Sequence, residues 1–132
     1  MKNPRTISGV PIRSPYASED TFFKGSPHVA GMATEDNQIA LNPYSRLSQE
    51  ERGAVAENEA ARVWMRRPEW APNVDLTPEQ AQKFATYGQP LDQRSTIIAR
   101  ILSGDQSAGA PTQQQLEYAQ RLAAAMRRID MK

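Results

Sequence analysis

The chain has 132 residues, with 16 basic and 15 acidic side chains, a formal net charge of +1 and no cysteine. Its length suits one domain with appendages, and its mean hydropathy of -0.68 is compatible with only a modest hydrophobic core. The balanced charge argues against a protein that wraps nucleic acid or coats a membrane surface, so we expect no specific nucleic-acid partner. The lack of cysteine excludes disulfides and thiolate metal sites.

Two kinds of targeting segment are not expected. No apolar run approaches the roughly 18 residues that a transmembrane helix needs. The N-terminus has no continuous apolar segment of the kind that a secretory signal carries. We therefore expect neither a membrane span nor export through a signal peptide.

Residues 1–27 contain four prolines and two glycines, and no helical or alternating apolar period runs through them. This composition predicts a long extended arm, followed by a compact helical domain over residues 28–132. Large apolar residues are nevertheless spread along the arm, more than a solvated tail would carry. We assign partner binding to five of these side chains: Ile7, Ile12, Tyr16, Phe22 and Phe23.

Two interpretations of this arm stay open. In the first, the arm lies on a protein partner and becomes ordered there, and each apolar side chain fills a pocket. In the second, the arm is a disordered leader, and only Phe22 and Phe23 pack onto the domain.

Residues 28–42 predict a β-hairpin, because two short apolar segments flank the polar turn cluster Thr34-Glu35-Asp36-Asn37. Two strands alone are marginally stable, so we expect them to pack on a helix. Asn42 precedes a proline and could accept a hydrogen bond from the backbone two residues on. His28 is either a surface residue at the strand edge or a pH switch or ligand.

Four helices are expected downstream, each with a capping residue at its start. Ser48 and Glu51 have the spacing of a capping box, and Pro68 ends this first helix. The N-caps of the other three helices are expected at Thr77, Asp92 and Thr112.

The third helix has the strongest apolar face in the chain, and we expect it to be the most buried element. The residues of this face are Ile97, Ile98, Ile101 and Leu102. The predicted fold is therefore mainly α, with four helices, a small N-terminal β-hairpin and a long extended N-terminal arm.

The first helix carries the sequence Asn58-Glu59-Ala60-Ala61-Arg62, and a strand and an Asn-Pro turn precede it. This order resembles the core of the zincin metallopeptidases, whose helix carries His-Glu-x-x-His. There the two histidines bind zinc and the glutamate is the general base. Here Asn58 and Arg62 stand at both histidine positions, so we expect no metal and no cofactor. We expect Glu59 and Arg62 to form a structural ion pair.

A second resemblance covers about four-fifths of the chain. It is carried by four segments: Val29-Ala30-Gly31-Met32, Leu41-Asn42-Pro43-Tyr44-Ser45, Asn58 to Arg62, and Ile101-Leu102-Ser103-Gly104-Asp105. Together they resemble small, mostly uncharacterised proteins of tailed bacteriophages. The resemblance implies a location in the virion or the host cytoplasm, and partners among the other virion components.

The chain contains no glycine-rich phosphate loop, no Gly-x-Ser-x-Gly motif and no cysteine nucleophile. We therefore hypothesise a non-enzymatic structural or interaction protein. It would be a minor capsid-associated, cementing or internal virion protein that binds its partner through the arm. Two alternatives stay open: a hydrolase that uses Glu59, either zincin-like or peptidoglycan-lytic, and a host-takeover inhibitor or adaptor. The sequence leaves the oligomeric state and the identity of the partner open.

Overall fold

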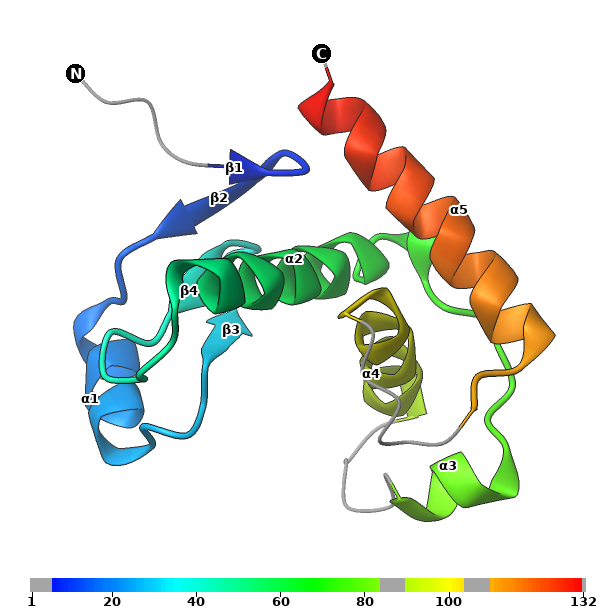
Figure 1. The fold of residues 1–132 in the computed structure, drawn as a ribbon, viewed down its shortest axis with the longest axis horizontal. Coiled ribbons are helices and arrows are strands. Elements are labelled where there is room, and N and C mark those ends of the chain that lie inside the picture. The colour runs from blue at the N-terminus through cyan, green and yellow to red at the C-terminus, as the bar shows by residue number, and fades with distance from the viewer. Residues whose placement is uncertain (1–5, 84–89, 104–109, 132) are drawn as a thin grey trace.

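The computed structural model describes residues 6–83, 90–103 and 110–131. Within these ranges the chain forms five α-helices, one short 3-10 helix and one four-stranded sheet (Figure 1). The strands are β1 (Thr6–Ile7), β2 (Val10–Arg13), β3 (Gly31–Ala33) and β4 (Ile39–Leu41). The helices are α1 (Ala17–Gly25), α2 (Gln49–Met65), η1 (Pro68–Trp70), α3 (Pro78–Lys83), α4 (Pro90–Ser103) and α5 (Gln113–Asp130).

The sheet joins two hairpins in the strand order β1-β2-β4-β3. The expected hairpin is present as the antiparallel pair of β3 and β4, with shorter strands than the range 28–42. A second antiparallel hairpin, β1 with β2, lies beside it. The two hairpins meet through a parallel pair in which Ile12 of β2 lies opposite Ile39 of β4. Helix α1 belongs to the connection between β2 and the β3–β4 hairpin.

The extended arm expected over residues 1–27 differs from what the structure has at residues 6–25, which form β1, β2 and α1. Val10 is 2% exposed and belongs to the hydrophobic core, against which Ile7 and Ile12 also pack. Phe23 is 0% exposed. The segment is ordered by its own chain because a turn with positive φ angles brings β1 back onto β2. Helix α1 is not among the four expected helices, and it brings the number of described α-helices to five.

Helix α2 is the centre of the molecule, with strands on one side and α4 and α5 on the other (Figure 1). Its buried side chains are Ala56, Ala60, Ala61, Val63, Trp64 and Met65. Three of these are alanines, so neighbouring elements approach the helix axis closely. Among the described residues α2 contributes the most buried apolar side chains, because it is covered on two sides. Residues 93–102 of α4 include no exposed position, in agreement with the expectation that this helix is strongly buried.

The helix starts follow local capping chemistry. Ser48 Oγ accepts from the backbone N–H of Glu51, and Glu51 Oε1 accepts from the backbone N–H of Ser48, both at 3.1 Å. Thr77 and Thr112 cap α3 and α5 through equivalent pairs with glutamines. Helix α4 begins at Pro90, ahead of the expected cap, so Asp92 lies inside this helix.

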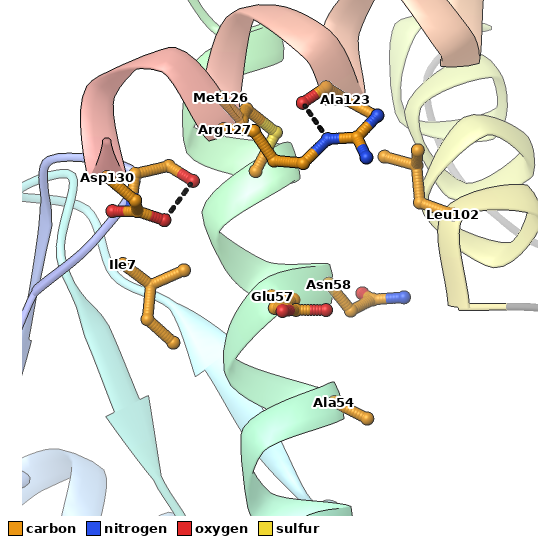
Figure 2. A pocket seen from close by; sticks show the side chains of 10 residues that line it. Ile7, Ala54, Glu57, Asn58, Leu102, Ala123, Met126, Arg127 and Asp130 are labelled. Carbon is orange, nitrogen blue, oxygen red and sulfur yellow. Dashed lines mark hydrogen bonds between the residues drawn. The ribbon is translucent and has the colours of Figure 1, made fainter. Parts of the chain in front are cut away.

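The turn between β1 and β2 lies against the last turn of α5. Figure 2 shows Ile7 and Asp130 next to each other at this junction. On the other side of the turn, Trp64 Nε1 donates a hydrogen bond of 3.0 Å to the carbonyl oxygen of Ser8. The N-terminal hairpin is therefore held between α2 and α5.

In the described part of the chain, no helix is both long enough and apolar enough to cross a membrane.

Candidate functional site

Glu59 lies on the side of α2 that faces β3, in a hollow of about 360 Å³. Its side chain is 13% exposed, and its Oε1 lies 3.7 Å from Arg62 Nε. Burial raises the pKa of Glu59, although the nearby guanidinium groups of Arg62 and Arg66 and a hydrogen bond from the Ala33 backbone act in the opposite direction. The carboxylate is thus partly paired and mostly removed from water.

The two residues at the zincin histidine positions connect α2 to α4. Asn58 Nδ2 donates to the carbonyl oxygen of Ala99 at 3.1 Å, and Arg62 Nε donates to Asn58 Oδ1 at 3.2 Å. Arg62 Nη1 also reaches the hydroxyl of Thr96 at 3.3 Å. Neither an amide nor a guanidinium can replace imidazole on zinc. Within the described ranges, no group of three or more His, Cys, Asp and Glu side chains could hold a metal ion.

Two charged side chains, Glu59 of α2 and Arg66 at the C-cap of this helix, also cover the open edge of β3. Arg66 Nη2 donates to the carbonyl oxygen of Ala33 at 2.9 Å, and Arg66 Nη1 donates to that of Thr34 and to Asn37 Oδ1. Glu59 accepts from the backbone of Ala33. A charged side chain at an edge strand blocks pairing with a foreign strand. The contacts of Glu59 and Arg66 therefore serve mainly to pack α2 on the sheet.

The five side chains assigned to partner binding fall into two groups. Ile7, Ile12 and Phe23 are turned toward the protein's own interior. Tyr16 and Phe22 are 56% and 48% exposed, at the start and on the outer side of α1. Only these two present a large surface to solvent.

Tyr44 is a third exposed aromatic residue near α1, and sequence reasoning missed it. It is 41% exposed, and its hydroxyl donates to Asp20 Oδ2 at 3.0 Å, which raises the pKa of Tyr44. The segment around it predicted only a turn. That turn is confirmed: Asn42 Oδ1 accepts from the backbone N–H of Tyr44 at 2.8 Å. We call Tyr16, Phe22 and Tyr44 the α1 aromatic residues.

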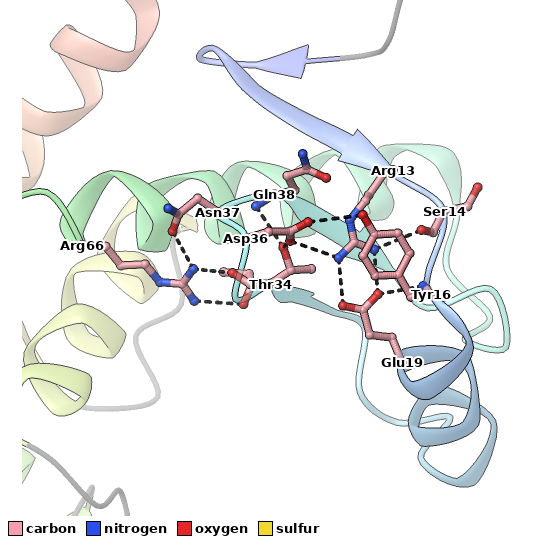
Figure 3. Close-up of polar contacts among 10 residues, drawn as sticks. Arg13, Ser14, Tyr16, Glu19, Thr34, Asp36, Asn37, Gln38 and Arg66 are labelled. Atoms are coloured by element: carbon pink, nitrogen blue, oxygen red, sulfur yellow. Dashed lines mark hydrogen bonds and ion pairs between the residues drawn. The ribbon is translucent and has the colours of Figure 1, made fainter.

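An ion cluster around Arg13 fixes the start of α1 (Figure 3). Its guanidinium forms two hydrogen bonds with Glu19, at 2.6 and 2.9 Å, and one with Asp36 at 3.1 Å. The same guanidinium lies 3.6 Å from the ring centroid of Tyr16, whose hydroxyl bonds Asp36 Oδ2 at 3.3 Å. The cluster therefore joins β2, α1 and the β3–β4 turn, and it holds the Tyr16 ring in place.

The charges of this cluster shift one another's pKa values. The hydrogen bond to Glu19 raises the pKa of Arg13 and lowers that of Glu19. The pKa of Asp36 is lowered first by the hydroxyl of Thr34 and then by Arg13. No spacing rule in the sequence connects these groups, because they come from three separate elements.

His28 is exposed and lies in the turn that precedes β3. Neither a switch nor a ligand role follows from this position.

No family model, no curated protein and no solved structure matches the chain.

Proposed function

We propose that the protein is a non-enzymatic interaction protein of a tailed-phage particle, either a minor capsid-associated, cementing or internal component. It would bind another virion protein through the α1 aromatic residues. The phage context comes from the sequence resemblance. The binding surface comes from one structural observation, the exposure of Tyr16, Phe22 and Tyr44.

The chemistry of these side chains supports a protein partner. Tyrosine and phenylalanine are enriched in the cores of protein interfaces, where one ring excludes much water at a small cost in rotamer entropy. Two of the three rings are also oriented before binding. Arg13 and Asp36 hold Tyr16, and Asp20 holds the hydroxyl of Tyr44. A surface that is ordered in advance loses less conformational entropy when a partner arrives.

The test compares particles that carry wild-type protein with particles that carry the triple variant Tyr16→Ser, Phe22→Ser and Tyr44→Ser. We expect the triple variant to be lost from purified particles, as counted by quantitative mass spectrometry. Met131→Ser is the matched control, because Met131 is 83% exposed but lies at the end of α5. Circular dichroism of both variants checks that the helices remain. Incorporation of the triple variant at the wild-type copy number contradicts the proposed surface.

The same experiment separates the virion protein from a host-takeover inhibitor or adaptor. An adaptor would use the same aromatic side chains but would be absent from purified particles. It would instead be recovered from infected cells together with a host protein, and the triple variant would no longer be recovered with that protein.

A hydrolase that uses Glu59 is the second candidate, and one observation favours it. A buried carboxylate with a raised pKa beside a hollow has the properties of a general acid or base. Digestion of casein or peptidoglycan by the wild type, lost in Glu59→Gln, would establish this function. A wild-type protein without either activity would leave Glu59 as a packing residue.

A further inference from the structure

A second surface, separate from the α1 aromatic residues, lies where α2, α5 and the β1–β2 hairpin meet. It is a groove of about 420 Å³, within the range of sites that bind ligands or partner side chains (Figure 2). Leu102 of α4 lines it as well. Its apolar lining residues are Ile7, Ala54, Leu102, Ala123 and Met126.

The two long walls of the groove are helix faces. Ala54, Glu57 and Asn58 lie on one face of α2, and Ala123, Met126, Arg127 and Asp130 lie on one face of α5. These spacings of three and four residues define neighbouring positions along a helix. A third helix can insert its side chains between two such rows. A partner helix carries anchors at the same spacings, and these anchors can enter the spaces between the lining residues.

The charges at the groove differ between its walls. Glu57 on α2 is exposed and makes no ion pair or hydrogen bond within the described ranges. On α5, Arg127 uses its Nε for a 3.4 Å contact with the carbonyl oxygen of Ala123, and the described residues leave its two terminal nitrogens unpaired. The remaining charged group, Asp130, accepts hydrogen bonds from Ser8. One unpaired anion and one unpaired cation thus stand on opposite walls.

We infer that this groove binds an amphipathic helix of a partner protein. The helix inserts a long apolar side chain between Ile7, Leu102 and Met126. A basic residue along one edge of that helix pairs with Glu57, and an acidic residue along the other edge pairs with Arg127. This charge pattern selects the partner, because a helix with like charges on both edges places one of them against its own sign.

The test uses three fluorescent synthetic helices of equal length with the same leucine stripe. The first has lysine on one edge and glutamate on the other, the second has lysine on both, and the third has glutamate on both. Fluorescence anisotropy measures their binding to the full-length protein. We expect the lysine–glutamate helix to bind at least tenfold more tightly than either of the others.

Three variants and one control define the site. Glu57→Lys makes both walls basic, so the preference should move to the glutamate–glutamate helix. Arg127→Glu should move it to the lysine–lysine helix. Ala54→Leu fills the groove from an exposed helical position and should weaken binding of every helix at least tenfold. Lys24→Glu on α1 is the matched charge control and should change nothing.

The inference is overturned if the three helices bind equally, if none binds, or if Glu57→Lys leaves the preference unchanged. Sedimentation velocity of the protein alone tests a different occupant. Self-association that disappears in Ala54→Leu would show that a second copy of the chain occupies the groove, which also overturns the inference.

Discussion

Asp130, in the last turn of α5, accepts two hydrogen bonds from Ser8, from its backbone N–H at 2.8 Å and from its hydroxyl at 3.4 Å. Ser8 is 4% exposed and has a φ of 54°, a left-handed conformation that is uncommon for a residue with a side chain. Bonds to Asp130 and to the indole of Trp64 hold this turn in place. The two ends of the described chain are thus joined directly.

The first prediction removes this junction. Asp130→Ala leaves the buried backbone N–H of Ser8 without its acceptor, which should lower the free energy of unfolding by about 1–3 kcal/mol. Asp130→Asn retains one acceptor oxygen and should cost less. Urea denaturation followed by circular dichroism measures both, with the exposed Arg128→Ala as control. Equal midpoints for wild type and Asp130→Ala would mean that the junction contributes no stability.

The second prediction uses two adjacent phenylalanines on α1. Phe23 is 0% exposed and Phe22 is 48% exposed. Phe23→Ala should lower the free energy of unfolding by about 3–5 kcal/mol, because it leaves a cavity in packed surroundings. Phe22→Ala should change it by less than about 0.5 kcal/mol. Thermal unfolding of the two variants provides the comparison. If both variants unfold at nearly the wild-type temperature, neither ring belongs to the core, and the expected extended arm would describe this segment better.

The parts of the fold that depend on near neighbours could be predicted from the sequence. The capping box at Ser48, the caps at Thr77 and Thr112 and the β3–β4 hairpin each depend on residues a few positions apart. The sequence pattern does not predict helix α1, although Glu19 accepts from the backbone N–H of Tyr16 at 2.8 Å in the manner of a capping residue. Its nine residues contain few apolar side chains, and prolines and glycines surround it.

The parts that depend on distant residues could not be predicted. The parallel pairing of β2 with β4 and the contacts of Arg13 bring together segments that no short spacing relates. The same holds for the candidate surface. The sequence indicates Tyr16 and Phe22 as binding residues, but their separation from buried Phe23 depends on which face of α1 meets the core. Tyr44 joined them only because Asn42 and Asp20 place it there.

The third prediction concerns acid stability. The folded-state pKa of Glu19 is lowered by Arg13, so its contribution is present above the unfolded pKa of about 4.3 and is lost as pH falls through the lower folded value. Glu19→Gln should cost roughly 1–3 kcal/mol at pH 7, because the pair is mostly shielded from solvent. This difference should shrink below pH 4. Urea denaturation at several pH values measures it, with the exposed Glu35→Gln as control.

An Arg13→Met variant provides an independent check of the same pair. It removes the partner of both Glu19 and Asp36, so its loss of stability should also diminish in acid. A loss that is the same at pH 7 and pH 3 would instead assign the role of Arg13 to packing on Tyr16.

The last prediction concerns Glu59, whose pKa is shifted upward and not downward as for Glu19. Burial raises its folded-state pKa, so its contribution to stability is fully present below the unfolded pKa of about 4.3 and is lost as pH rises through the folded value. Glutamine cannot ionise, and its amide oxygen can still accept from the backbone of Ala33. Glu59→Gln should therefore raise the free energy of unfolding at pH 7 relative to wild type, and the difference should vanish below pH 4. Urea denaturation across this range measures it, with Glu57→Gln on the exposed face of the same helix as control. A glutamine variant that is less stable at pH 7 would show that the pairing of Glu59 with Arg62 outweighs the cost of its burial.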